Sequence, residues 1–220
     1  MKNIIVIGSG GHAKVVIDII EKEKKYNIIG LIDTCKSKGD KVFNYSVLGE
    51  EKDLINLTEQ YNIYGCIIAI GDNWMRSIVK SKIAKLEIPL KHITTIHPSA
   101  VIGKEATIGN GTVIMANSTI GSNTTIDSFC IVNTNASIDH DSNMSLFSSI
   151  APGVTTGGNV SIGEYSAISI GASIIHNITI GKHTIVGAGS LVVNDIKDFI
   201  VEYGTPSKFI RKREKGDKYL

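Results

Sequence analysis

Residues 119–141 read TIGSNTTIDSFCIVNTNASIDHD, and an aliphatic side chain returns there at almost every sixth position. Stepping by six from Ile96 to Val192 gives seventeen positions, and fifteen of them hold Ile or Val. The residue four places after each of them is small or β-branched, as at Thr124 and Ala136. A six-residue repeat of this kind indicates a parallel β-helix, in which one residue of each flat face points inward and stacks on its equivalents in neighbouring coils.

The length of the repeat predicts the size of the coil. Three hexads make a triangular coil of eighteen residues, so the repeat between about Ile96 and Ile196 predicts roughly five to six coils spaced ~4.8 Å apart. Glycine follows many of the aliphatic positions, and asparagine is frequent between them. Both residue types adopt left-handed backbone conformations at low cost, so we expect them at the corners of the coil. The expected corner residues include Gly103, Gly109, Gly121, Gly163, Gly181, Gly187, Asn110, Asn117, Asn123, Asn133 and Asn135.

The part of the chain before the repeat has a different rhythm. Short apolar runs at residues 4–7, 28–32 and 66–70 alternate with amphipathic stretches at residues 13–24 and 74–86, which is typical of βαβ units with a parallel sheet. The predicted fold class is therefore α/β plus all-β. We expect a half-Rossmann-like domain at residues 1–92, followed at residues 93–220 by a β-helix domain with a C-terminal tail.

Composition narrows the possible partners and the compartment. A net charge of +2 gives no strong field for binding nucleic acid or an anionic membrane, and residues 208–218 are read as a solvated basic end. The cysteines Cys35, Cys66 and Cys130 form neither a disulfide framework nor a CxxC metal pattern, which favours a reducing cytoplasm. No apolar run approaches the ~20 residues of a membrane span, and the apolar opening is too short for a signal peptide.

A glycine-rich loop follows the first predicted strand. Residues 8–13 read GSGGHA, which satisfies the loose dinucleotide fingerprint, and Asp33 follows about 20 residues later, where an acidic residue would meet a ribose hydroxyl. The first ~95 residues hold only one mononucleotide-binding half, so the pattern indicates a helix N-terminus directed at phosphate rather than a dehydrogenase. Helix capping or packing remains an alternative for His12, and turn capping remains one for Asp33.

A histidine interrupts the repeat between two aspartates. His140 comes two residues after the inward Ile138, so it is expected on the outer surface, beside Asp139 and Asp141. Histidine titrates near neutral pH and commonly accepts a proton from an attacking amine or hydroxyl. A carboxylate bonded to one ring nitrogen would fix the tautomer and leave the other nitrogen free to act. The alternative is a merely solvated histidine. The repeat also loosens nearby, at Met144 and Thr156, as expected where a site is built.

Several motifs together resemble the bacterial sugar acetyltransferases of the bacillosamine, perosamine and sialic acid pathways, which belong to the hexapeptide-repeat, left-handed β-helix class. These motifs are Gly-x-Gly-Gly-His12, Ile32-Asp33, Ile68-Ala-Ile-Gly71-Asp-Asn73, Asn133, Asp139-His140-Asp141, Gly158-Asn159-Val160 and Tyr203-Gly204-Thr205-Pro206-Ser207. The resemblance implies a left-handed coil, a first domain that binds a nucleotide-linked sugar, a homotrimer, and acetyl-CoA in the groove between adjacent β-helices.

The same resemblance implies roles for individual residues. It favours Asp141 as the partner of the catalytic His140, and the N–H of Gly158 as a donor to the developing oxyanion. Ser149 stands where the family often has a second histidine. The residues implied to bind the sugar substrate are Gly8, Ser9, Gly10, His12, Asp33, Gly71, Asn73 and Asn133, although a corner position explains Asn133 equally well. Those implied to bind acetyl-CoA are Ser149, Gly158, Ile170, Gly187, Ala188 and Pro206.

The predicted function is acetyl-CoA-dependent N-acetylation of the 4-amino group of a nucleotide-linked 4-amino-4,6-dideoxy sugar, for surface polysaccharide or glycan synthesis. The main alternative is O-acetylation of a sialic-acid-type sugar by the same base. A γ-carbonic-anhydrase-like metalloenzyme and a non-catalytic scaffold are further rivals. His176 shares the phase of His140 but lies two coils away, about 10 Å, and His183 has another phase, so no metal site is expected.

Overall fold

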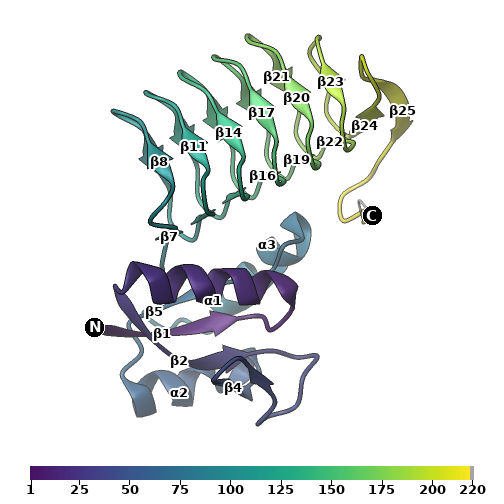
Figure 1. Cartoon of the computed structure of the whole chain (residues 1–220). Coiled ribbons are helices and arrows are strands. Elements are labelled where there is room, and N and C mark those ends of the chain that lie inside the picture. The colour runs from purple at the N-terminus through teal and green to yellow at the C-terminus, as the bar shows by residue number, and fades with distance from the viewer. Residues whose placement is uncertain (219–220) are drawn as a thin grey trace. The chain divides into compact units, whose positions relative to one another are not determined.

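The computed structural model describes residues 1–218, which divide into two compact units (Figure 1). The first unit ends at Ile96 and the second begins at His97. This division lies just beyond the expected boundary at residue 92. The reason is that β6 (Lys91–His92) is an edge strand of the first unit's sheet, where Cys66 pairs with His92.

A six-stranded sheet forms the centre of the first unit, in the order β3-β4-β2-β1-β5-β6. Only the β3–β4 pair is antiparallel. The strands are β1 (Lys2–Ile7), β2 (Tyr26–Ile32), β3 (Lys41–Val42), β4 (Tyr45–Gly49), β5 (Gly65–Ile68) and β6, and the short strand β7 (Thr95–Ile96) ends the unit. The helices are α1 (Gly11–Glu23), α2 (Leu54–Tyr61) and α3 (Asn73–Ala84), with the 3₁₀ turn η1 (Glu51–Asp53) before α2. None of the described helices is long and apolar enough to cross a membrane.

The predicted parallel sheet is present, and its centre is β1. Residues 4–7 form a continuous aliphatic run that is buried on both sides, as is usual for a central strand of a parallel sheet. The chain passes from β1 to β2 on one side and later to β5 on the other. The loops that follow β1 and β5 therefore meet at the point where the strand order reverses, which is where open α/β sheets bind ligands.

The second unit is a parallel β-helix with three faces (Figure 1). The first face holds β8 (Val101–Ile102), β11 (Thr119–Ile120), β14 (Ser137–Ile138), β17 (Thr155–Thr156), β20 (Ser173–Ile174) and β23 (Leu191–Val192). The second holds β9 (Thr107–Ile108), β12 (Thr125–Ile126), β15 (Asn143–Met144), β18 (Ser161–Ile162) and β21 (Thr179–Ile180). The third holds β10 (Val113–Ile114), β13 (Ile131–Val132), β16 (Ser149–Ile150), β19 (Ala167–Ile168), β22 (Ile185–Val186), β24 (Ile200–Tyr203) and the antiparallel β25 (Lys208–Lys212).

Strand partners within the coils are eighteen residues apart, as in Thr119 with Ser137 and Ile120 with Ile138. The second residue of each strand points inward, and Ile120 and Ile138 are fully buried. The predicted coil length and inward phase are therefore confirmed. From Thr112 onward the residues four places later are also buried, and hydroxyls among them bond to backbone carbonyls: Thr124 Oγ1 donates to Asp139 O at 2.8 Å.

The corners of the coil are left-handed turns. Every sixth residue from Glu105 to Gly189 has a positive φ, between 52° and 73°. The expected asparagines at 117, 123 and 135 occupy these positions, whereas Asn110 and Asn133 do not. The glycines that follow the aliphatic positions are also not the left-handed residues. At Gly121, for example, an added Cβ would lie 2.4 Å from His140 N, so this glycine is required for close approach of the next coil.

One column of corners carries aromatic rings instead of asparagine. Phe129, Phe147, Tyr165, His183 and Phe199 stack on one another, with ring centroids 4.6–5.3 Å apart. Bulky residues seldom adopt positive φ. Stacking between successive coils adds a favourable contact for each ring, and this offsets the backbone cost at these corners.

Candidate active site

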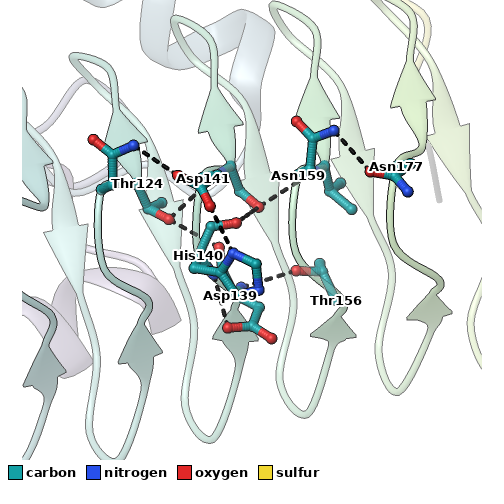
Figure 2. Close-up of polar contacts among 10 residues, drawn as sticks. Thr124, Asp139, His140, Asp141, Thr156, Asn159 and Asn177 are labelled. Atoms are coloured by element: carbon teal, nitrogen blue, oxygen red, sulfur yellow. Dashed lines mark hydrogen bonds and ion pairs between the residues drawn. The ribbon is translucent and has the colours of Figure 1, made fainter.

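His140 lies at the corner that follows β14 on the first face (Figure 2). Its side chain is 60% exposed, so the outward orientation predicted from its phase is observed. The next residue, Asp141, is the left-handed corner residue itself, with φ of 56°. The imidazole is therefore attached to the residue directly before the left-handed position of the corner.

Asp141, rather than Asp139, contacts the imidazole. Asp141 Oδ2 lies 2.7 Å from His140 Nδ1, whereas Asp139 Oδ1 accepts the backbone N–H of His140 at 2.7 Å. Because an ionised carboxylate can only accept, Nδ1 carries the proton and Nε2 is left as the basic nitrogen of the neutral ring.

The carboxylates around the imidazole favour its protonated form. The hydrogen bond that His140 donates to Asp141, and then the negative charge of Asp139, raise the pKa of His140 above its usual value. The hydrogen bonds from Asn123, and then from His140, lower the pKa of Asp141. Asp141 is therefore ionised whenever His140 titrates, and the neutral, basic form of His140 is lost as the pH falls through its raised pKa.

The backbone before His140 is held by two threonine hydroxyls (Figure 2). Thr124 Oγ1 donates to Asp139 O at 2.8 Å, and the N–H of Asp139 donates to Thr156 Oγ1 at 3.1 Å. At the equivalent place in other coils the donor bonds to a backbone carbonyl, as Gly121 N does to Ile138 O. Thr156 thus accounts for one interruption of the aliphatic repeat: its hydroxyl replaces a backbone acceptor beside His140.

Gly158 lies against the imidazole from the next coil. A Cβ built on Gly158 would be 2.5 Å from His140 Cε1 and 2.6 Å from Nε2, so the ring occupies the space of the missing side chain. The neighbouring amides of Gly157 and Asn159 donate to Ile174 O and His140 O. Within residues 1–218 the N–H of Gly158 makes no such bond, which leaves a donor beside the basic nitrogen.

The glycine loop of the first unit orders an acidic group. Ser9 Oγ donates to Asp33 Oδ2 at 2.6 Å, and Asp33 Oδ1 accepts the N–H of Cys35 at 2.6 Å. Turn capping, the alternative considered for Asp33, is therefore present. Gly8 has φ of 109°, and its N–H donates to Ile32 O. Together these contacts hold Asp33 beside the loop that opens α1.

A buried cation organises the neighbouring loop after β5. Arg76 is 1% exposed and donates to the carbonyls of Ile70 and Gly71, each at 3.0 Å, and to Asn73 Oδ1 at 2.8 Å. Asn73 is itself 1% exposed, and its side-chain oxygen accepts the bond that fixes Arg76. The sequence did not identify Arg76, because an arginine in an amphipathic helix is normally solvated.

His12 is packed against this loop, next to Gly71. Burial, and then the charge of Arg76, lower the pKa of His12 to about 4, so the ring is neutral at pH 7. Its Nε2 is buried and has no hydrogen-bond partner in the part of the chain that the structure describes. A buried polar atom without a partner is costly, and a ligand at the loop could supply the partner.

Several residues implied to bind acetyl-CoA gather at one corner near the C-terminal end of the first face. The N–H of Gly189 donates to Ile170 O, and a Cβ on Gly187 would meet Tyr203. Ala188 lies between these two glycines, and Pro206 belongs to the segment that follows Tyr203. In each coil this corner comes before the first-face strand, and the corner that holds His140 comes after it. The residues implied to bind acetyl-CoA and His140 therefore lie at opposite edges of the first face.

Two other implied residues lie away from His140 within the chain. Ser149 is in β16 and Asn133 follows β13, both on the third face. The Oδ1 of Asn133 accepts the N–H of Thr134, a local role that explains the residue without a ligand. Within residues 1–218, no group of three or more His, Cys, Asp or Glu side chains could hold a metal ion.

Comparison with known proteins identifies the family. Residues 3–83 match the family model described as the PglD N-terminal domain. A histidine-to-alanine variant of GDP-perosamine N-acetyltransferase from Caulobacter crescentus, solved with CoA and GDP-perosamine, is 31% identical, with 96% of this chain and 98% of that chain covered and a TM-score of 0.90. The chain belongs to the hexapeptide-repeat sugar acetyltransferases.

Other members of this acetyltransferase family match in the same way. The acetyltransferase domain of PglB from Neisseria gonorrhoeae is 33% identical, with 96% of this chain and 100% of that domain covered and a TM-score of 0.88. UDP-N-acetylbacillosamine N-acetyltransferase from Bacillus subtilis is 34% identical over 112 residues, which are 51% of this chain and 50% of that relative. The chain thus matches about half the length of this curated relative. The family and fold class expected from the sequence are confirmed.

The contact between His140 and Gly158 predicts the effect of adding one methyl group. Gly158→Ala should displace the imidazole and weaken its bond to Asp141, so the pKa of His140 should fall toward its usual value. NMR titration of the His140 ring measures this shift. Ser122→Ala, at the equivalent position two coils earlier, is the control and should leave the titration unchanged. An unaltered His140 pKa in Gly158→Ala would contradict the described packing.

Proposed function

We propose that the protein transfers the acetyl group of acetyl-CoA to the 4-amino group of a nucleotide-linked 4-amino-4,6-dideoxy sugar, with His140 as general base. The observation that carries this proposal is the exposed His140–Asp141 pair beside Gly158. The relative from Caulobacter crescentus supports the substrate class, since it was solved with CoA and GDP-perosamine. The relative from Bacillus subtilis, named for UDP-N-acetylbacillosamine, supports N-acetylation.

The proposed reaction uses each group of the site once. The amine nitrogen attacks the thioester carbonyl carbon while Nε2 of His140 accepts its proton, and the resulting imidazolium is stabilised by Asp141. The N–H of Gly158 would donate to the oxyanion of the tetrahedral intermediate. Collapse of this intermediate breaks the carbon–sulfur bond, and the departing thiolate takes the proton back from His140. The products are the amide and free CoA.

The first unit is proposed to bind the nucleotide. The N-terminus of α1 follows Gly10, whose position leaves open space around its Cα, and backbone N–H groups at such a terminus attract phosphate. Asp33 would accept a hydrogen bond from the ribose. The buried Nε2 of His12 would gain a partner from the same ligand, which accounts for a polar atom that is otherwise unsatisfied.

Acetyl-CoA is proposed to bind along the first face, between the His140 corner and the corner that holds Ile170, Gly187, Ala188 and Pro206. Ile170 is 61% exposed, so this corner offers apolar surface as well as backbone groups. The three cysteines are free thiols, which suits the reducing cytoplasm where we propose that the enzyme works. Its acetylated sugar would serve surface polysaccharide or glycan synthesis.

Removal of the base tests the mechanism directly. His140→Ala should lower kcat by about 10² to 10⁴, the usual contribution of a positioned general base, with KM for acetyl-CoA little changed. Thiol release from acetyl-CoA is measured with a panel of nucleotide 4-amino sugars. His176→Ala is the matched control, because His176 is an exposed histidine in the same column two coils away. Wild-type kcat in His140→Ala would rule out the assignment.

Replacement of Asp33 tests the nucleotide site. Asp33→Ala should raise KM for the nucleotide sugar about ten- to a hundred-fold, the effect of losing one hydrogen bond to a charged acceptor, and leave KM for acetyl-CoA unchanged. Asp40→Ala is the control, since Asp40 caps the turn at Ser37 in the same connection. An unchanged KM in Asp33→Ala, or faster turnover of free sialic acid than of any nucleotide sugar, would favour sugar O-acetylation instead.

We also propose that three copies assemble through their β-helices. Flat faces suit such packing, and Ile170 and Ile175 are apolar residues exposed by 61% and 39% at the corner before β20 and just after that strand. Sedimentation equilibrium under assay conditions should give three times the mass of one chain, which is 23.7 kDa. A monomer that retains full activity would disprove this assembly.

A further inference from the structure

The corner beside His140 contains a second polar contact that the proposed mechanism does not use. One residue per coil occupies this corner, all at positive φ, and the column reads Glu105, Asn123, Asp141, Asn159 and Asn177. Because successive members are eighteen residues apart, each side chain lies next to the corresponding one in the adjacent coil. The column therefore allows side chains to bond from coil to coil.

Asn123 bonds to the aspartate that holds the imidazole. Asn123 Nδ2 donates to Asp141 Oδ1 at 2.7 Å, while the other oxygen of the same carboxylate, Oδ2, is 2.7 Å from His140 Nδ1. Both carboxylate oxygens thus have a partner, on opposite sides. Two bonds fix the plane of the carboxylate, whereas a single bond to an exposed aspartate would leave it free to rotate.

Exposure makes this second bond important. The side chain of Asp141 is 52% exposed and that of His140 is 60% exposed, and a solvent-exposed ion pair alone fixes side-chain geometry weakly. No surrounding core holds the pair. Its support comes from the corner backbone of Asp141, from Asn123 in the coil before and from Gly158 in the coil after.

We infer that Asn123 is a positioning residue of the active site, whose side-chain amide holds the Asp141 carboxylate in the orientation that fixes the His140 ring. This inference rests on the proposed role of His140 as general base. Asn123 does not touch the reacting atoms. It acts through Asp141, so that a chain of hydrogen bonds runs from Asn123 in one coil to His140 in the next.

The charges around the site agree with this role. The hydrogen bond that Asn123 donates is the largest cause of the lowered pKa of Asp141, and the hydrogen bond that His140 donates to Asp141 is the largest cause of the raised pKa of His140. Within residues 1–218, the charged groups that shift the pKa of His140 are Asp139 and Asp141, both in its own corner, while the facing Asn123 and Gly158 are uncharged. Loss of the Asn123 amide therefore removes the bond that orients the Asp141 carboxylate and leaves the net charge of the site unchanged.

The chain offers a matched control for this test. Asn159 Nδ2 donates to Asn177 Oδ1 at 2.8 Å, which is the same corner contact on later coils and does not involve Asp141. Glycine adopts positive φ without strain, so Asn123→Gly and Asn177→Gly each break one amide bond while leaving the corner backbone relaxed. Their thermal unfolding temperatures should be lowered by similar amounts.

Kinetics and NMR titration then separate positioning from stability. Asn123→Gly should lower kcat about ten-fold, the order expected for a lost hydrogen bond to a charged group, with both KM values nearly unchanged. The pKa of His140 should fall toward its usual value, and the acidic limb of the kcat/KM profile should move to lower pH. Asn177→Gly should match the wild type in kcat and in the His140 titration.

Two results would overturn the inference. One is a wild-type kcat and His140 titration in Asn123→Gly, and the other is an equal loss in Asn177→Gly, which would indicate a general effect of corner stability. Failure of the proposed function would look different. In that case the wild-type protein would release no thiol with any nucleotide sugar, while the NMR titration would still report whether Asn123 orients the His140–Asp141 pair.

Discussion

The structure depends on the hydrogen-bond register that places residues eighteen apart directly beside one another. Backbone N–H groups of one coil donate hydrogen bonds to the next coil through strand pairs such as Thr119 with Ser137. A side chain therefore lies between its equivalents one coil before and one coil after. The core follows from this register, because inward aliphatic residues stack in columns. The proposed active site follows from it as well, because Asn123 with Asp141 and His140 with Gly158 are also pairs at this spacing.

The left-handed corners fix the geometry of the proposed active site. Asp141 is at a corner with φ of 56°, and this conformation places its carboxylate beside the imidazole of the preceding residue. A catalytic pair on an exposed loop would normally need a surrounding core to hold it. Here the backbone turn and the adjacent coils give that support, and Thr156 contributes by accepting the N–H of Asp139 in place of a backbone carbonyl.

In the first unit, buried contacts order the two loops at the carboxyl ends of β1 and β5. Arg76 is buried beneath the second loop and bonds to the carbonyls of Ile70 and Gly71, so its charge is held by backbone dipoles and by Asn73. That charge also helps to keep His12 neutral. A neutral ring has one basic nitrogen and one donor, and it can therefore face a polar ligand without adding a buried charge.

The sequence alone determined the repeat, the length of the coil, the parallel sheet of the first unit and the outward placement of His140. These follow from periodicity, since the spacing of apolar residues decides which side chains face the core. Tertiary structure decided which aspartate contacts His140, that the glycines after the aliphatic positions permit close approach of coils, and that Asn73 positions a buried Arg76. It also decided the contacts of Asn123 and Gly158. Each of these depends on contacts between residues of different coils or loops. The spacing of residues in the sequence specifies which face of an element a side chain occupies, but not which atoms contact each other across two elements.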